Sequence, residues 1–231
     1  MAIVFGLTTT YMLAEAGGGF LTGSLALLAD AGHMLTDAAA LGLALFAIRY
    51  AERPANPRKT FGYHRAEMLA ALVNAVVLLL ISIFVLYEAW RRFSHPPKVM
   101  SIPMLGIALL GLIVNFIGMR LLSGSAEHSL NVKAAYLEVL SDMLGSLGVL
   151  AASAIMITTG WYLADPIFGA AIGLFIVPRT WKMLKDTAHI LMEGVPANVN
   201  LQLLQEEMLR VPGVTTVHDI HVWTLRLDWT R

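Results

Sequence analysis

Six long apolar stretches alternate with short polar segments along this chain. They run from about Ala2 to Leu21, Leu25 to Ile48, Ala66 to Trp90, Ile102 to Leu121, Ala134 to Thr158 and Tyr162 to Leu184. A helix that crosses the hydrocarbon core of a bilayer needs about 20 mostly apolar residues. The pattern therefore predicts six transmembrane helices within residues 1–186. No small-residue cleavage site follows the first stretch, so we expect it to be retained as a helix rather than removed as a secretory signal.

The pattern changes after Thr187. Residues 200–209 have the spacing of a short amphipathic helix, and Pro212-Gly213 predicts a turn. Residues 214–225, which are rich in β-branched and aromatic side chains, predict a β-strand. Residues 187–231 are too few to bury a core of their own. We expect an all-α membrane protein with six transmembrane helices and a short, truncated α/β cytosolic segment, which leans on the membrane domain or on a second subunit.

Composition agrees with a membrane protein. Hydrophobic residues make up 57% of the chain and charged residues only 14%, whereas soluble domains carry about 25% charged residues. The formal net charge is zero, which gives no electrostatic reason to expect nucleic acid as a partner. The chain has no cysteine, which excludes disulfides, thiolate nucleophiles and thiolate metal sites. Any metal ion must therefore be held by His, Asp, Glu, backbone oxygen or water.

The distribution of basic residues predicts the orientation, because cytoplasmic links carry the excess of Lys and Arg. One side of the predicted bundle has Arg49, Arg53, Arg58, Lys59, Arg65, Arg120, Lys133, Arg179, Lys182 and Lys185, whereas the other side has only Arg91, Arg92 and Lys98. Both termini are therefore expected in the cytoplasm, with the protein in the cell (inner) membrane.

Ionisable residues interrupt the apolar stretches. They are Glu15, Asp30, His33, Asp37, Glu138 and Asp142. Such residues are costly at membrane depth and commonly line ion pathways. No Lys or Arg lies deep in the same stretches to neutralise them. An external cation is therefore expected.

The spacing of these residues indicates a metal site. His33 and Asp37 are four residues apart, as are Glu138 and Asp142, so each pair shares one helix face. Two such helices side by side offer the four ligands of a tetrahedral divalent site. One such pair could be structural, but two matching pairs favour metal. Asp30 could orient the imidazole of His33 through a hydrogen bond or could lie at the helix start.

Other polar residues give weaker indications of a function. Glu15 could be structural or functional, Asn115 could be an interhelical hydrogen-bonder, and Asp165 before Pro166 has the position of a helix cap. His218 and His221, three residues apart in the predicted strand, point to opposite faces, although His218 could contribute to a cytosolic metal site with residues from elsewhere.

Four segments of the chain resemble the cation diffusion facilitator family, whose members include zinc, cobalt and cadmium efflux transporters. These segments are residues 23–37 (GSLALLADAGHMLTD), 61–67 (FGYHRAE), 131–142 (NVKAAYLEVLSD) and 217–225 (VHDIHVWTL). The resemblance implies six helices, a homodimer, and export of zinc-type ions from the cytoplasm in exchange for protons. It also implies that His33, Asp37 and Asp142 are metal ligands, whereas Glu138 stands where the family usually has His.

Glu138 changes the charge of the predicted site. With Glu138 the ligands sum to −3, so a bound divalent ion would leave an uncompensated charge in the membrane. We therefore expect Glu138 to keep a proton in some states, and the oxygen-rich site to accept Co²⁺ or Cd²⁺ besides Zn²⁺.

Competition between protons and metal for the same ligands would drive antiport. The metal is then the transported substrate, and no prosthetic group is expected. The absence of a Walker motif agrees with secondary transport. The alternatives are a proton-coupled transporter of organic cations and a membrane metalloenzyme, for which no His-Glu-x-x-His motif is present.

Overall fold

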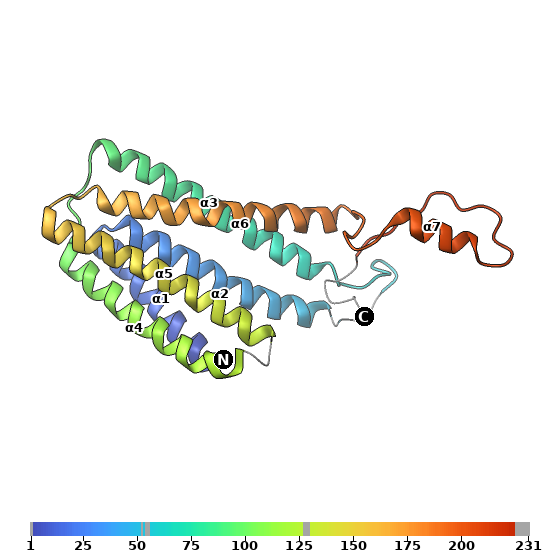
Figure 1. Ribbon diagram of the computed structural model, residues 1–231, viewed down its shortest axis with the longest axis horizontal. Helices are drawn as coiled ribbons and strands as arrows, with labels where there is room; N and C mark the ends of the chain where they lie inside the picture. Colours follow the sequence, from blue (N-terminus) through green and yellow to red (C-terminus); the bar gives the residue numbers. More distant parts are fainter. Residues whose placement is uncertain (1, 52, 54–55, 127–129, 225–231) are drawn as a thin grey trace. The chain divides into compact units, whose positions relative to one another are not determined.

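The computed structural model describes the whole chain except residues 1, 52, 54–55, 127–129 and 225–231 (Figure 1). Its helices are α1 (Ala2–Thr22), α2 (Leu25–Ala51), α3 (Ala66–Ser94), α4 (Ser101–Ala126), α5 (Leu130–Thr159), α6 (Ala164–Leu191) and α7 (Leu201–Leu209). Each of the six long helices and the short one was expected from the sequence. Their ends differ from the predicted ends by a few residues, because terminal turns depend on local capping more than on hydropathy.

Four of the described helices are long and apolar enough to cross a membrane. The qualifying segments are Ala66–Ser94, Ser101–Ser123, Ala135–Thr159 and Ala164–Leu191. Many large apolar side chains on these helices face outward, among them Leu80, Phe84 and Phe175. A surface of this kind would be unfavourable in water and is expected where lipid replaces water.

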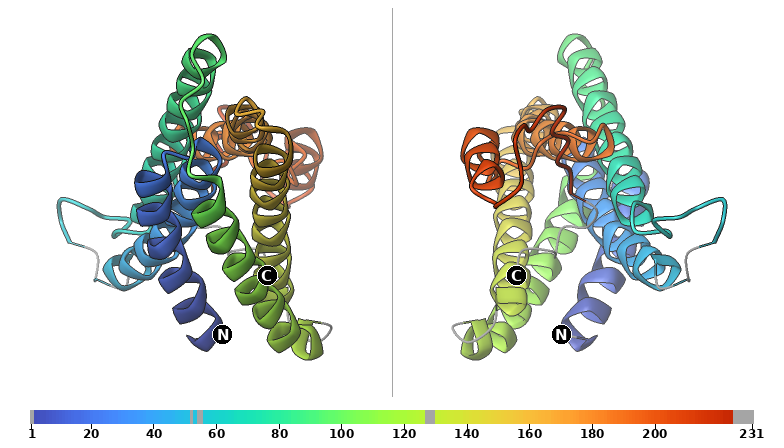
Figure 2. Two further views of the ribbon diagram at one scale, coloured as in Figure 1. Left: turned by 90° about the vertical axis from the view of Figure 1, so that its left-hand side faces the viewer. Right: turned by 90° about the vertical axis from the view of Figure 1, so that its right-hand side faces the viewer.

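The chain forms two compact units, and α2, α3 and α6 contribute residues to both. The first unit consists of residues 1–39 and 76–180. Within it α4 packs against both α1 and α5, and lies between them in the views of Figure 2. The largest apolar cluster joins Ala26 and Leu27 of α2 to Met104 of α4 and Val149 of α5. This packing brings together α2 and α5, the two helices that carry the predicted ligands.

Asp165, at the start of α6, caps a helix other than its own. Its fully buried carboxylate accepts hydrogen bonds from the Ser24 hydroxyl at 2.5 Å and from the backbone N–H groups of Leu25 at 2.7 Å and Ala26 at 3.2 Å. Arg92 Nη1 lies 3.5 Å from Asp165 Oδ2. The sequence predicted that Asp165 caps its own helix, but Asp165 lies inside the first turn of α6 and caps α2 instead. The sequence could not show that the capped helix is α2, because the two segments are about 140 residues apart.

The second unit consists of residues 40–75 and 181–231. The side chain of Asn200 caps α7 by accepting hydrogen bonds from the N–H groups of Gln202 and Leu203. The expected β-strand over residues 214–225 is not formed. Residues 214–224 have no regular structure, and residue 225 lies outside the described part. A strand is stable only when its backbone pairs with a neighbour, and the described residues of this unit provide no second strand.

Candidate metal centre

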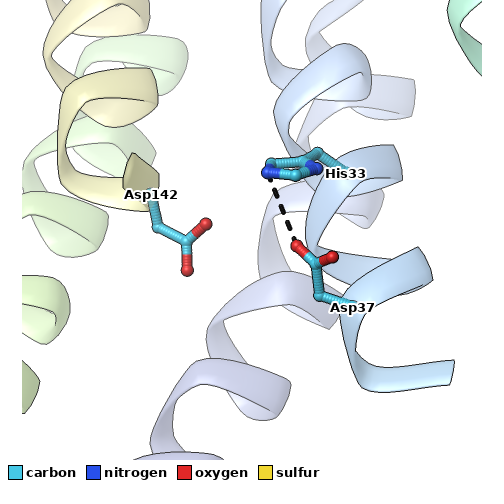
Figure 3. A group of neighbouring side chains, drawn as sticks. All are labelled: His33, Asp37 and Asp142. Atoms are coloured by element: carbon cyan, nitrogen blue, oxygen red, sulfur yellow. Dashed lines mark ion pairs between the residues drawn. The ribbon is translucent and has the colours of Figure 1, made fainter. Parts of the chain in front are cut away.

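Two helices of the first unit bring three of the predicted ligands together. His33 and Asp37 project from successive turns of α2 toward Asp142 of α5 (Figure 3). One ligand atom from each of the three lies within 4.8 Å of the other two. His33 Nε2 lies 3.4 Å from Asp37 Oδ2. A tetrahedral ion with ligand distances of about 2.1 Å separates its ligand atoms by about 3.4 Å, so this spacing suits one edge of a zinc-type site.

Burial makes the grouping costly without a cation. His33 is 8% exposed and Asp142 is 6% exposed. Each of the four predicted residues has one side-chain atom that solvent does not reach and that has no hydrogen-bond partner. These atoms are His33 Nδ1, Asp37 Oδ2, Glu138 Oε1 and Asp142 Oδ1. Buried polar atoms without partners are unfavourable, and a cation could compensate the buried carboxylates. Imidazole nitrogen with carboxylate oxygen is a donor set that suits Zn²⁺ and related divalent ions.

Glu138 adjoins this group but differs from the other three in its surroundings. Its Oε1 lies 4.0 Å from His33 Nε2, and its carboxyl group is within hydrogen-bonding reach of that of Asp37. Its Oε2 accepts a hydrogen bond from Arg179 Nη2 of α6 at 3.2 Å. Glu138 thus lies between the predicted site and a guanidinium group.

The Arg179 contact corrects an expectation from the sequence. We expected no basic side chain near the acidic residues, because Arg179 falls near the C-terminal end of the sixth apolar stretch. In the folded chain the guanidinium of Arg179 neutralises Glu138. Asp37 and Asp142 then carry the remaining charge of −2, which a divalent ion balances. The charge argument for a proton held on Glu138 therefore no longer applies.

Asp30 does not orient His33. The Nδ1 atom of His33 has no hydrogen-bond partner, so the expected hydrogen bond between the two side chains is not formed. Asp30 instead lies within hydrogen-bonding reach of Glu15 on α1. A sequence signal for this contact existed. Glu15 and Asp30 lie at similar distances on either side of the short turn at Gly23, so an antiparallel hairpin brings them to the same level.

His218 and His221 form no comparable group in the part of the chain that the structure describes. His218 is exposed, and its Nδ1 lies 3.1 Å from Asp219 Oδ2. The only metal-type cluster found among the described residues is that of His33, Asp37 and Asp142.

Comparison with known proteins identifies the family. Residues 1–192 match the model of the cation efflux transmembrane domain. This chain belongs to the cation efflux family. The resemblance to cation diffusion facilitators is thereby confirmed, and as a member of this family the chain is a multi-pass membrane protein.

Three relatives illustrate the similarity of this cation efflux protein to other proteins. It is 49% identical over 225 residues to the metal cation efflux system protein CzcD of Cupriavidus metallidurans, covering 97% of this chain and 71% of that protein. It is 44% identical over 227 residues to the cadmium, cobalt and zinc/H(+)-K(+) antiporter of Bacillus subtilis, and the match covers 97% of this chain and 73% of that protein. It is 48% identical over 221 residues to the zinc transporter ZitB of Escherichia coli, and the match covers 95% of this chain and 71% of that protein.

Proposed function

We propose that this cation efflux protein exports divalent transition-metal ions, Zn²⁺ and also Co²⁺ or Cd²⁺, from the cytoplasm in exchange for protons. The names of its relatives support both the metals and the antiport. The observation that carries the proposal in this chain is the convergence of His33, Asp37 and Asp142 in a buried site. Membership of a transporter family favours transport over catalysis, so we propose that the protein is not an enzyme.

In this proposal His33, Asp37 and Asp142 are metal ligands, and Glu138 is the fourth. Glu138 Oε1 faces His33 and has no partner, while Oε2 stays with Arg179. Glu138 can therefore complete the site without adding net charge. Only two ligand carboxylates remain unpaired, which favours a divalent over a monovalent ion.

Exchange follows from the chemistry of these ligands. His33 binds a metal through an unprotonated nitrogen, and Asp37 and Asp142 bind as carboxylates, so protons displace the metal. A site open to the cytoplasm loads metal, and the same site open to a more acidic exterior releases it. Alternation between the two states by movement of one group of helices against another needs no nucleotide.

The wider organisation is proposed on the same basis. Six membrane-spanning helices within residues 1–186 and a cytosolic segment over residues 187–231 agree with the even number of spans that puts both termini in the cytoplasm. We propose the cell (inner) membrane as the location and a homodimer as the assembly, since a short cytosolic segment gains stability by packing against a second copy.

Flux measurement in liposomes tests the proposed function. Purified full-length protein is reconstituted into vesicles with an acidic interior, and Zn²⁺ and pH are followed in the lumen with two indicators. We expect Zn²⁺ entry to be accompanied by a rise in luminal pH. Asp142→Ala should abolish both signals, whereas Asp186→Ala, which removes an exposed carboxylate on α6, should preserve both.

Three other results would contradict the proposal. Zn²⁺ entry without proton movement would indicate a passive channel. Proton movement that requires an organic cation and no divalent metal would indicate a carrier of organic cations. Metal binding without flux of any ion would favour an enzyme.

A further inference from the structure

A second group of buried polar side chains lies in the first unit, about one helical turn from the metal centre along both α2 and α5. Four helices contribute to it: Tyr11 and Glu15 from α1, Asp30 from α2, Asn115 from α4 and Ser146 from α5. None of the five is more than 2% exposed. Asp30 is three residues from His33. Among the described residues no hydrogen bond or ion pair joins Asp30 to the four proposed ligands, although Asp142 is near enough to interact with it electrostatically.

These side chains form a connected series. Tyr11 donates its hydroxyl hydrogen to Glu15 Oε1 at 2.9 Å, and Asn115 Nδ2 donates to Ser146 Oγ at 3.4 Å. Tyr11 and Ser146 are themselves within hydrogen-bonding reach. The series ends where the carboxyl groups of Glu15 and Asp30 meet.

The two carboxyl groups are buried next to each other, and no positive charge from the described residues faces them. Glu15 Oε2 and Asp30 Oδ2 are both inaccessible to solvent, and neither has a hydrogen-bond donor. The charged or titratable groups that face the pair from the surrounding helices are Tyr11 and Asp142, and neither supplies positive charge. Two adjacent carboxylates in a low dielectric repel strongly, whereas one shared proton gives both oxygen atoms a partner. A shared proton therefore suits this pair.

A larger cation does not suit the same place. The backbone of α5 approaches Asp30 so closely that a Cβ added at Gly145 would overlap Asp30 Oδ1 and lie 3.0 Å from Oδ2. At Gly111 of α4, a Cβ would overlap the Tyr11 hydroxyl. An ion such as K⁺ needs a shell of several oxygen atoms to replace its water. A proton needs only two oxygen atoms.

We propose that Glu15 and Asp30 form a proton-binding site separate from the metal ligands, which keeps one shared proton throughout and binds a second when the metal centre is empty. The proposal rests on the proposed antiport. The positive charge of a metal one helical turn away favours the pair with one proton, and loss of the metal favours the pair with two. The pair thus adds one proton to the exchange through charge and without contact with the metal.

Infrared spectroscopy of the unaltered protein provides the first test, and it does not depend on transport. In the zinc-loaded state at neutral pH, Asp37 and Asp142 are held as ligands and Glu138 is paired with Arg179. A C=O stretch from a protonated carboxyl group must then come from elsewhere, and we expect one from Glu15 and Asp30. Zinc-loaded wild-type protein without any such band would overturn the proposal.

Proton counting provides the second test. We expect the double variant Glu15→Gln/Asp30→Asn to bind Zn²⁺, to lack the infrared band, and to exchange one proton fewer per Zn²⁺ than wild type in liposomes. The control Glu193→Gln removes an exposed carboxylate that pairs with Arg65, and it should behave as wild type.

Other outcomes of the second test count against the proposal. An unchanged proton count would assign all exchanged protons to the metal ligands. An unchanged proton count with loss of K⁺-dependent flux, measured with and without luminal K⁺, would make the group a potassium site. Failure of wild-type protein to move Zn²⁺ would refute the proposed function, while the infrared band would still decide whether the pair holds a proton.

Discussion

The ion pair between Arg179 and Glu138 is expected to limit the affinity of the metal centre. Arg179→Met removes the guanidinium but keeps an apolar stem of similar length, so Glu138 is free to direct its whole charge toward the metal. The side chains of Arg179 and Glu138 are 60% and 32% exposed, respectively. At 3.2 Å an ion pair of this exposure is worth at most about 1 kcal/mol after solvent screening. Since 1.4 kcal/mol corresponds to a tenfold change, Arg179→Met should bind Zn²⁺ up to about fivefold more tightly at alkaline pH.

Isothermal titration of Zn²⁺ in detergent measures this effect. Glu138→Gln should weaken binding because it removes a ligand charge and leaves Arg179 unneutralised beside the metal. The double variant Glu138→Gln/Arg179→Met should bind more tightly than Glu138→Gln alone, because it restores neutrality of the metal-bound site. Lys182→Met, which removes an exposed positive charge from the same helix, serves as the control and should leave the affinity unchanged. If Arg179→Met bound Zn²⁺ no more tightly than Lys182→Met, the ion pair would have no part in setting affinity.

Four further predictions concern the site and its support. Asp142→Ala should lower Zn²⁺ affinity by at least about 100-fold, measured by titration, because it removes one of two uncompensated ligand charges. In the wild type, Zn²⁺ affinity measured from pH 8 downward should fall by roughly tenfold per pH unit for each proton displaced from the ligands. Asp165→Asn should destabilise the protein by about 3 kcal/mol in thermal unfolding, because it leaves Arg92 and the start of α2 without their buried carboxylate. Gly145→Ala should abolish transport, since the added Cβ overlaps Asp30.

Matched variants serve as controls for the three predictions that rest on substitutions. Asp186→Ala and Asp186→Asn alter an exposed carboxylate on α6 and should change neither affinity nor stability. Gly106→Ala adds a Cβ that meets nothing within 4 Å, so it should transport as wild type. Equal loss of transport in Gly106→Ala and Gly145→Ala would contradict the reasoning from close packing at Asp30.

Much of the metal centre was predictable because it depends on helical periodicity. His33 and Asp37 are one turn apart on α2, as are Glu138 and Asp142 on α5. A helix keeps such pairs on one face whether lipid, water or protein surrounds it. The resemblance to cation diffusion facilitators then linked the two helices. The expected strand over residues 214–225 failed because strand formation depends on a partner, which β-branched composition alone does not supply.

Hydropathy and helical spacing in the sequence determined the long helices, the faces that carry ionisable residues and the chemistry of the ligands. These are properties of neighbouring residues, and they follow from the 3.6-residue period and from the cost of polar groups in lipid. Only the tertiary structure decided that Arg179 neutralises Glu138, that Asp165 caps α2, and that Asp30 meets Glu15 instead of His33. These contacts join side chains on different helices. Which of them form depends on how the helices pack and rotate against one another, which no single segment specifies.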